Sequence, residues 1–267
     1  MTKEMKNALN SLVKYYIQEL RSQIPKRWNS LIIDLAKKEV YEVLFGQLAR
    51  QVTLCLQFVK NPNCWTFDLA PVILRCMADN YINFAWIAKD VDDRSKKFIL
   101  YGLGQEKLSF EHRKDQIIKD GGDPNKDPLV KYNEAWLNSQ RYTFLTEVNI
   151  GSWSGISIRQ MAEEADCIDF YNYVYTPFSS VAHNMWGHLT RYNLVVSDNP
   201  LHKNLKIPVI NESFIDIYNI KLAAMYLDKM IRLFDGVFKI KLDEKSAYDK
   251  LLSEFKKFEN QFLKNNG

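Results

Sequence analysis

The segment "PVILRCMADNYINFAWIAK", residues 71–89, decides the fold of this chain. Its apolar residues occur in every direction around a helix, a pattern typical of a helix that is buried on all sides. Yet Arg75 and Asp79 lie in it one turn apart, and Asn80 and Asn83 follow closely. A buried charge is costly unless it is paired, so we expect Arg75 and Asp79 to pair with each other. Asn80 and Asn83 need partners from another helix, which predicts that further helices pack closely around this one.

The rest of the 267 residues follows the same helical period, with apolar residues recurring at spacings of three and four. Only 10 glycines and 8 prolines are present, so the chain has few of the turns that strand-rich folds need. These features predict an all-α fold, a bundle of about eight to ten helices, in a single domain over residues 1–267. The loop at 120–128, which contains "GGDPNKDP", is the one place where the chain could divide.

Prolines, glycines and capping residues set the boundaries of the predicted helices. Pro25 is expected to end the first helix, Gly46 to bend the second and Asp68 to cap the third. A capping box formed by Ser157 and Gln160 begins a later helix. The predicted helices cover about 3–24, 28–60, 69–89, 94–119, 129–140, 157–176, 178–195, 213–239 and 244–264. Residues 144–155 are expected to be irregular or a short strand pair, and 196–213 a long loop.

Charge and cysteine content favour a soluble protein of a reducing cytoplasm. The net charge of +4 is too small to indicate nucleic-acid binding by itself, and the basic residues are spread along the chain. The four cysteines form no CxxC pair, and three of them lie among apolar residues, as reduced thiols do. The N-terminus lacks an apolar leader and no segment reaches ~20 apolar residues, so we expect no membrane contact.

A second polar group lies in the segment "YTPFSSVAHNMWGHLTRYN", residues 175–193. Histidine titrates near neutral pH and can transfer a proton, and an arginine beside it can bind an anionic oxygen. A histidine among apolar residues can equally be a core residue with satisfied hydrogen bonds, so both interpretations stay open. The candidate polar residues of this segment are Tyr175, Ser179, His183, Asn184, His188 and Arg191.

Motifs that specify a cofactor are absent. The chain contains no phosphate-binding glycine loop, no dinucleotide fingerprint and no HExxH pair. His183 and His188 are five residues apart, which is a poor spacing for one metal on one helix. A metal would need acidic ligands brought in by the tertiary fold, such as Glu163, Glu164 or Asp166. We therefore predict no metal and no cofactor.

Three segments occur in a characteristic order: "LRCMADNYINFAWIAKD", then "FILYGLGQEKL", then "SIRQMAEEADCIDFYNYVYTPFSSVAHN". This order resembles a prokaryotic helical family, the domain of unknown function DUF5677, which has Arg-x-x-x-Glu in a buried helix and a later Tyr…Ser-x-x-x-His motif. The resemblance covers roughly residues 40–195. It implies that the motif positions are Arg75, Asp79, Tyr175, Ser179 and His183, with Asp79 shorter than the family's usual Glu. The family name implies no activity.

A looser similarity is to the HEPN helical ribonucleases of toxin and antiviral systems, which also place Arg and His on packed helices. Their signature is an Arg followed, after four to six residues, by a His on the same helix. No histidine in this chain has an Arg at that upstream distance. Ribonuclease activity would therefore need a composite site, in which Arg75 faces His183 across two helices.

These residues lead to a functional hypothesis. The chain is predicted to be a bacterial toxin-like or phage-defence effector with a polar pocket that acts on RNA or a nucleotide. His183 would be the general acid or base, and Arg75 would hold a phosphate or other oxyanion. The expected catalytic residues are Arg75, Asp79, Ser179 and His183. The expected substrate-binding residues are Asn83, Tyr175, Asn184, His188 and Arg191.

The alternative is a non-catalytic helical interaction module in which the same network is structural. Such a module would act by binding a protein partner or a second copy of the chain. Aromatic side chains would serve that role if the fold left them exposed. The aromatic residues concerned are Trp136, Trp153, Trp186, Tyr171, Tyr173 and Tyr175.

Overall fold

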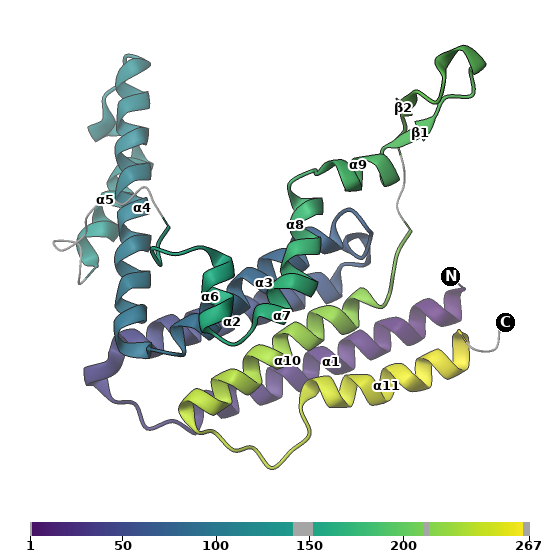
Figure 1. The fold of residues 1–267 in the computed structure, drawn as a ribbon. Helices are drawn as coiled ribbons and strands as arrows, with labels where there is room; N and C mark the ends of the chain where they lie inside the picture. The colour runs from purple at the N-terminus through teal and green to yellow at the C-terminus, as the bar shows by residue number, and fades with distance from the viewer. Residues whose placement is uncertain (1, 141–151, 211–213, 264–267) are drawn as a thin grey trace.

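The computed structural model describes residues 2–140, 152–210 and 214–263. Helix α3 (Ala70–Ile87), which carries the segment that decides the fold, lies at the centre of a multi-helix bundle (Figure 1). Leu74, Met77 and Phe84 on α3 are completely buried. The prediction of an all-α bundle is therefore confirmed. The helices in contact with α3 include α2 (Lys38–Lys60), α6 (Ile158–Glu164), α8 (Thr176–Ala182) and α10 (Asn219–Phe238).

Helices α1 (Lys3–Asn29) and α11 (Ala247–Phe262) pack against each other beside α10 (Figure 1). Their buried residues join those of α2, α3 and α10 in one large hydrophobic core. This core contains Tyr16 and Phe58 from before the loop at 120–128 and Phe234 and Phe255 from after it. Among the described residues, no helix has the length and apolar character needed to cross a bilayer.

Helices α4 (Val91–Lys119) and α5 (Pro128–Ser139) form a hairpin that projects from the bundle (Figure 1). The short 3-10 turn Pro124–Lys126 joins them. A small apolar cluster of its own holds the hairpin together, formed by Leu103, Phe110, Val130 and Leu137. The loop predicted at 120–128 is thus the tip of a helical hairpin.

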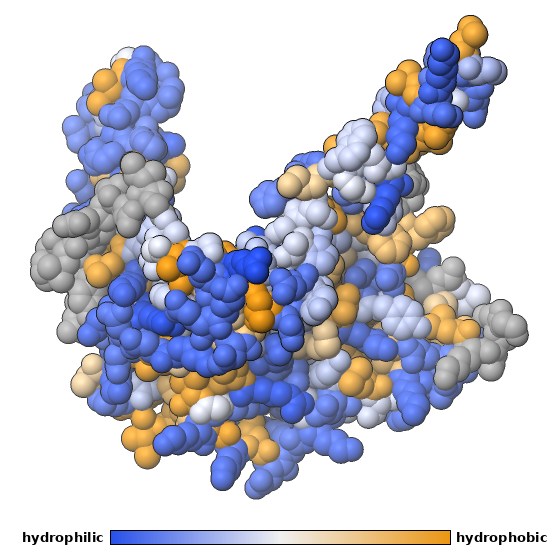
Figure 2. Space-filling model, viewed as in Figure 1, coloured by the Kyte–Doolittle hydropathy of each residue, from blue (hydrophilic) through white to orange (hydrophobic). Residues whose placement is uncertain are grey.

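A second projection follows α8 and consists of α9 (Trp186–Tyr192), β1 (Leu194–Val196) and β2 (Lys206–Pro208). We call β1, β2 and the turn between them the hairpin arm, residues 194–208. The strands are antiparallel, with Leu194 opposite Pro208. The prediction of a long loop over 196–213 was therefore wrong for Lys206–Pro208, because these residues pair with β1. Figure 2 shows apolar side chains gathered on this arm.

Several helix boundaries differ from the prediction, including the start of α10 at Asn219 and the end of α6 at Glu164. Helix α1 continues through Pro25 to Asn29, although proline disfavours a helix interior. Its last turn is held by Arg27, whose side chain is 5% exposed and forms two hydrogen bonds of 2.7 Å with Asp235 of α10. This tertiary contact offsets the local cost of the proline. Helix α2 begins at Lys38 and not near residue 28.

The chain from α7 (Ile168–Phe170) to α8 is helical but contains a wider π turn, Tyr171–Tyr175. Pro177 follows in the first turn of α8. Proline has no N–H and its ring crowds the preceding turn of an α-helix, so a wider turn before it relieves the conflict. Helix α8 then ends at Ala182, and the helix predicted over 178–195 is divided at residues 183–185.

Candidate functional site

Helices α3 and α8 bring together the polar residues that the sequence separates by about a hundred positions. We call Arg75, Asp79, Tyr175, Ser179 and His183 the Arg75 cluster. Arg75 and Asp79 lie one turn apart on α3, and Ser179 lies on α8. Tyr175 is the last residue of the π turn, and His183 caps the C-terminus of α8.

Arg75 is the centre of this cluster and is held from three sides. Its Nε donates a hydrogen bond of 2.6 Å to Ser179 Oγ, which joins α3 to α8. Its Nη1 donates to Asp79 Oδ2, so the predicted ion pair within α3 is present. Its guanidinium carbon lies 3.3 Å from the centre of the Tyr175 ring, a cation–π contact. These contacts fix the guanidinium at the boundary between the two helices.

The cluster lies at the edge of the core and is partly open to solvent. The Arg75 side chain is 12% exposed and that of Asp79 is 37% exposed, and His183 is also exposed. Burial raises the pKa of Asp79 above its usual range, while Arg75 and His183 act in the opposite direction. Burial also raises the pKa of Tyr175, and the nearby Asp79 carboxylate adds to this effect.

The backbone turns sharply directly after the cluster. The His183 N–H donates to Ser179 O at 2.9 Å, which completes the last turn of α8. Asn184 follows with φ of 52°, a left-handed conformation that asparagine tolerates better than most residues. Asn184 thus ends α8 and redirects the chain into α9, and its side chain is exposed.

The other predicted substrate-binding residues lie in different surroundings. Asn83 accepts a hydrogen bond of 3.2 Å from Trp153 Nε1. His188 is buried, with its Nε2 3.2 Å from Asp68 Oδ1. Arg191 is on the exposed face of α9.

Two contacts near the cluster were missed in the sequence. The Tyr171 ring stacks on the Tyr175 ring at 4.9 Å, behind the face that Arg75 contacts. Aromatic residues four apart on a helical segment were the available signal. Asp68 was expected to cap α3, but α3 begins at Ala70 without a side-chain cap. Asp68 faces His188 instead, a tertiary contact that no local pattern indicates.

Asn80, the remaining polar residue of α3, lies on a different side from Arg75. Its Nδ2 donates to Gln47 O and to Gln51 Oε1, both at 2.9 Å, and both acceptors are on α2. This satisfies the expectation that Asn80 needs a partner from another helix. In the described residues, no group of three or more His, Cys, Asp or Glu side chains could hold a metal ion.

Comparison with known proteins gives one result. A family model described as "Family of unknown function (DUF5677)" matches residues 41–200, which is more than half of the chain. The matched range begins in α2 and ends after β1, so it contains the whole Arg75 cluster. No curated protein and no solved structure matches the chain.

Proposed function

The chain belongs to the DUF5677 family of unknown function, and we propose that it acts on RNA or a nucleotide through the Arg75 cluster. One observation carries the proposal. The Arg75 guanidinium, placed on a helix whose only exposed residues are Val72 and Cys76, is joined to Ser179 and Tyr175 across a helix contact and lies at a partly open surface. A charge in this position is costly to maintain, so an exposed edge with further polar groups favours a functional role.

Arg75 is suited to hold an oxyanion such as a phosphate oxygen. Its Nε and Nη1 donate to Ser179 and Asp79, and its face lies on Tyr175, so its orientation is fixed before a substrate arrives; the remaining Nη protons can donate to a phosphate oxygen. Donors oriented in advance stabilise developing negative charge without a cost of reorganisation. In this role Asp79 orients Arg75, and Ser179 or Tyr175 positions the substrate.

His183 is suited to transfer the proton. It is exposed at the end of α8, one turn after Ser179, which accepts the hydrogen bond from Arg75. A histidine that can gain or lose a proton near neutral pH serves as a general acid or base toward a bound phosphoester. The composite arrangement, with Arg75 and His183 on two packed helices, takes the place of a single-helix Arg and His motif.

We further propose that the biological setting is a bacterial toxin or phage-defence system acting in the cytoplasm. A nuclease or nucleotide hydrolase in such a system would damage RNA or exhaust a nucleotide pool. The small net charge of +4 favours a short RNA segment or a single nucleotide over a long duplex as the substrate.

A second candidate function is a non-catalytic interaction module, and exposed apolar side chains favour it. Trp186 is 68% exposed and Tyr173 is 78% exposed, close to the Arg75 cluster along the chain. The hairpin arm exposes Leu201 to 85% and Leu205 to 55%. Exposed apolar groups on a projecting segment are typical of a surface that binds a protein partner or a second copy.

An expression experiment tests the two candidates against each other. Wild type, Arg75→Ala and His183→Ala are induced in bacteria, growth is followed, and total RNA and nucleotide pools are examined. The enzymatic proposal expects growth arrest with RNA or nucleotide loss in wild type only, with both variants folded by circular dichroism. Harmless wild type with intact RNA and nucleotides contradicts it, and the interaction module then takes its place.

A further inference from the structure

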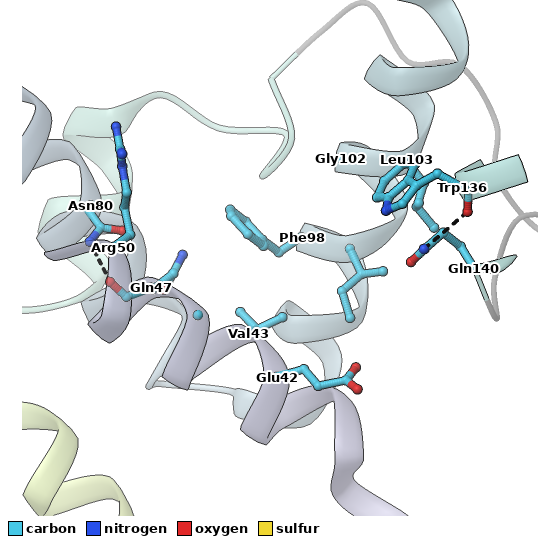
Figure 3. A pocket seen from close by; sticks show the side chains of 12 residues that line it. Glu42, Val43, Gln47, Arg50, Asn80, Phe98, Gly102, Leu103, Trp136 and Gln140 are labelled. Carbon is cyan, nitrogen blue, oxygen red and sulfur yellow. Dashed lines mark hydrogen bonds between the residues drawn. The ribbon is translucent and has the colours of Figure 1, made fainter. Parts of the chain in front are cut away.

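A cavity of about 480 Å³ lies between α2, α4 and α5, with Asn80 of α3 at one end (Figure 3). This volume is within the range of sites that bind small molecules. The walls are mainly apolar, although Glu42 and Arg50 also line them, and are contributed by two helices of the bundle and by the projecting hairpin. The apolar lining residues are Val43, Phe98, Ile99, Leu103 and Trp136.

Two glycines in the middle of helices face this cavity, Gly46 on α2 and Gly102 on α4. Glycine inside a helix is less favourable than alanine, so it usually marks a place where a side chain would clash. Here, a Cβ built on either glycine meets no atom within 4 Å. Close packing therefore does not explain these two glycines, and each adds open space beside the cavity that it lines.

One polar group on the wall has unused hydrogen-bonding capacity. Gln47 lines the cavity and is only 5% exposed. Its Oε1 is buried and has no hydrogen-bond partner among the described residues. A buried oxygen in this state is unfavourable until it meets a donor. Oε1 is enclosed as it stands, so the Gln47 amide must turn for Oε1 to reach a donor in the cavity, and this turn breaks no hydrogen bond made by Oε1.

We propose that this cavity binds a neutral small molecule with an apolar ring system and one hydrogen-bond donor, which pairs with Gln47 Oε1. The apolar walls take up the ring, and the Gln47 amide selects for the donor. The site is separate from the Arg75 cluster, because Asn80 faces α2 while Arg75 faces α8. The proposal therefore stands whether or not the Arg75 cluster is catalytic.

Indole and 1-methylindole are matched probes, since both have an apolar ring system but only indole has an N–H donor. Isothermal titration of the full chain is expected to give saturable binding of indole, about tenfold tighter than that of 1-methylindole, as one hydrogen bond provides. Gln47→Leu is expected to remove this preference, so that the two probes bind with equal affinity.

Cavity-filling variants locate the binding. Gly102→Leu and Gly46→Leu place a side chain in the cavity, and each is expected to weaken indole binding at least about tenfold while the helical circular dichroism is kept. Gly236→Leu is the matched control, because Gly236 is also a helix glycine with open space around it but lies on α10. If the Gly102→Leu variant does not fold, Gly102→Ala replaces it as the variant that adds a side chain at this wall of the cavity. No saturable indole binding to wild type, or equal binding by wild type and the Gly102 variants, overturns the proposal.

Discussion

The hydrogen bond from Arg75 to Ser179 should contribute measurably to the free energy of unfolding, and Ser179→Ala tests it. The bond joins a charged donor to a neutral acceptor over 2.6 Å. Such bonds contribute about 1.5–3 kcal/mol. Since 12% of the Arg75 side chain is exposed, water can replace part of the lost bond. We therefore expect Ser179→Ala to lower the free energy of unfolding by about 1.5 kcal/mol, the lower end of that range.

Urea denaturation followed by circular dichroism provides the measurement, and Ser180→Ala is the matched control. The Ser180 hydroxyl donates to Pro177 O in its own helix and makes no bond to α3. Its removal should change the stability by no more than about 0.5 kcal/mol. A double-mutant cycle with Arg75→Met should give a coupling energy of about 1 kcal/mol between Arg75 and Ser179. Additive effects of the two changes, or equal effects of the two serines, refute the contact between α3 and α8.

Three further predictions concern pH, a buried ion pair and thiol reactivity. Because burial raises the pKa of Asp79, the folded state holds this proton more tightly, so stability should fall as pH rises from the ordinary aspartate pKa through the raised one. The urea midpoint of Asp79→Asn, measured over the same pH range, should not show that decline. Parallel pH profiles of the midpoints of wild type and Asp79→Asn would contradict this expectation. Asp235→Ala leaves Arg27 buried without its partner and should cost about 3 kcal/mol in urea denaturation, whereas a loss below about 1 kcal/mol would contradict the pairing. The pKa of Cys55 is raised by burial to about 12, so a thiol reagent at neutral pH should modify exposed Cys76 in the native protein and Cys55 only after unfolding; rapid native labelling of Cys55 would contradict its burial.

The sequence was most informative where local spacing and burial act together. Arg75 and Asp79 are four apart on a helix that is apolar on nearly every side, so their pairing follows from helix geometry alone. Partners from other helices were expected for Asn80 and Asn83 because unpaired buried groups are costly, and each has a partner outside α3. The capping box at Ser157 was also predicted and is present with both of its hydrogen bonds.

The remaining features depend on contacts that local patterns do not encode. Pro25 stays inside α1 because Arg27 is anchored to Asp235, which is 208 residues away. Asn83 bonds to Trp153, because the chain after residue 151 returns across α3, a path that spacing does not specify. The cavity beside Gln47 was not predicted. No sequence motif marks it, because it forms where Gly46 of α2 and Gly102 of α4 have no side chains.

A cleavage assay with purified protein tests most directly whether the Arg75 cluster is an active site. Wild type, His183→Ala and the control His112→Ala are incubated with a labelled mixed-sequence RNA and with nucleoside triphosphates, and the products are separated and identified by mass. His112 is an exposed histidine on the projecting α4, far in sequence from the Arg75 cluster. We expect wild type and His112→Ala to convert RNA or a nucleotide, whereas folded His183→Ala leaves both intact. Equal conversion by His183→Ala, or no conversion by wild type, contradicts the proposal that the Arg75 cluster is an active site.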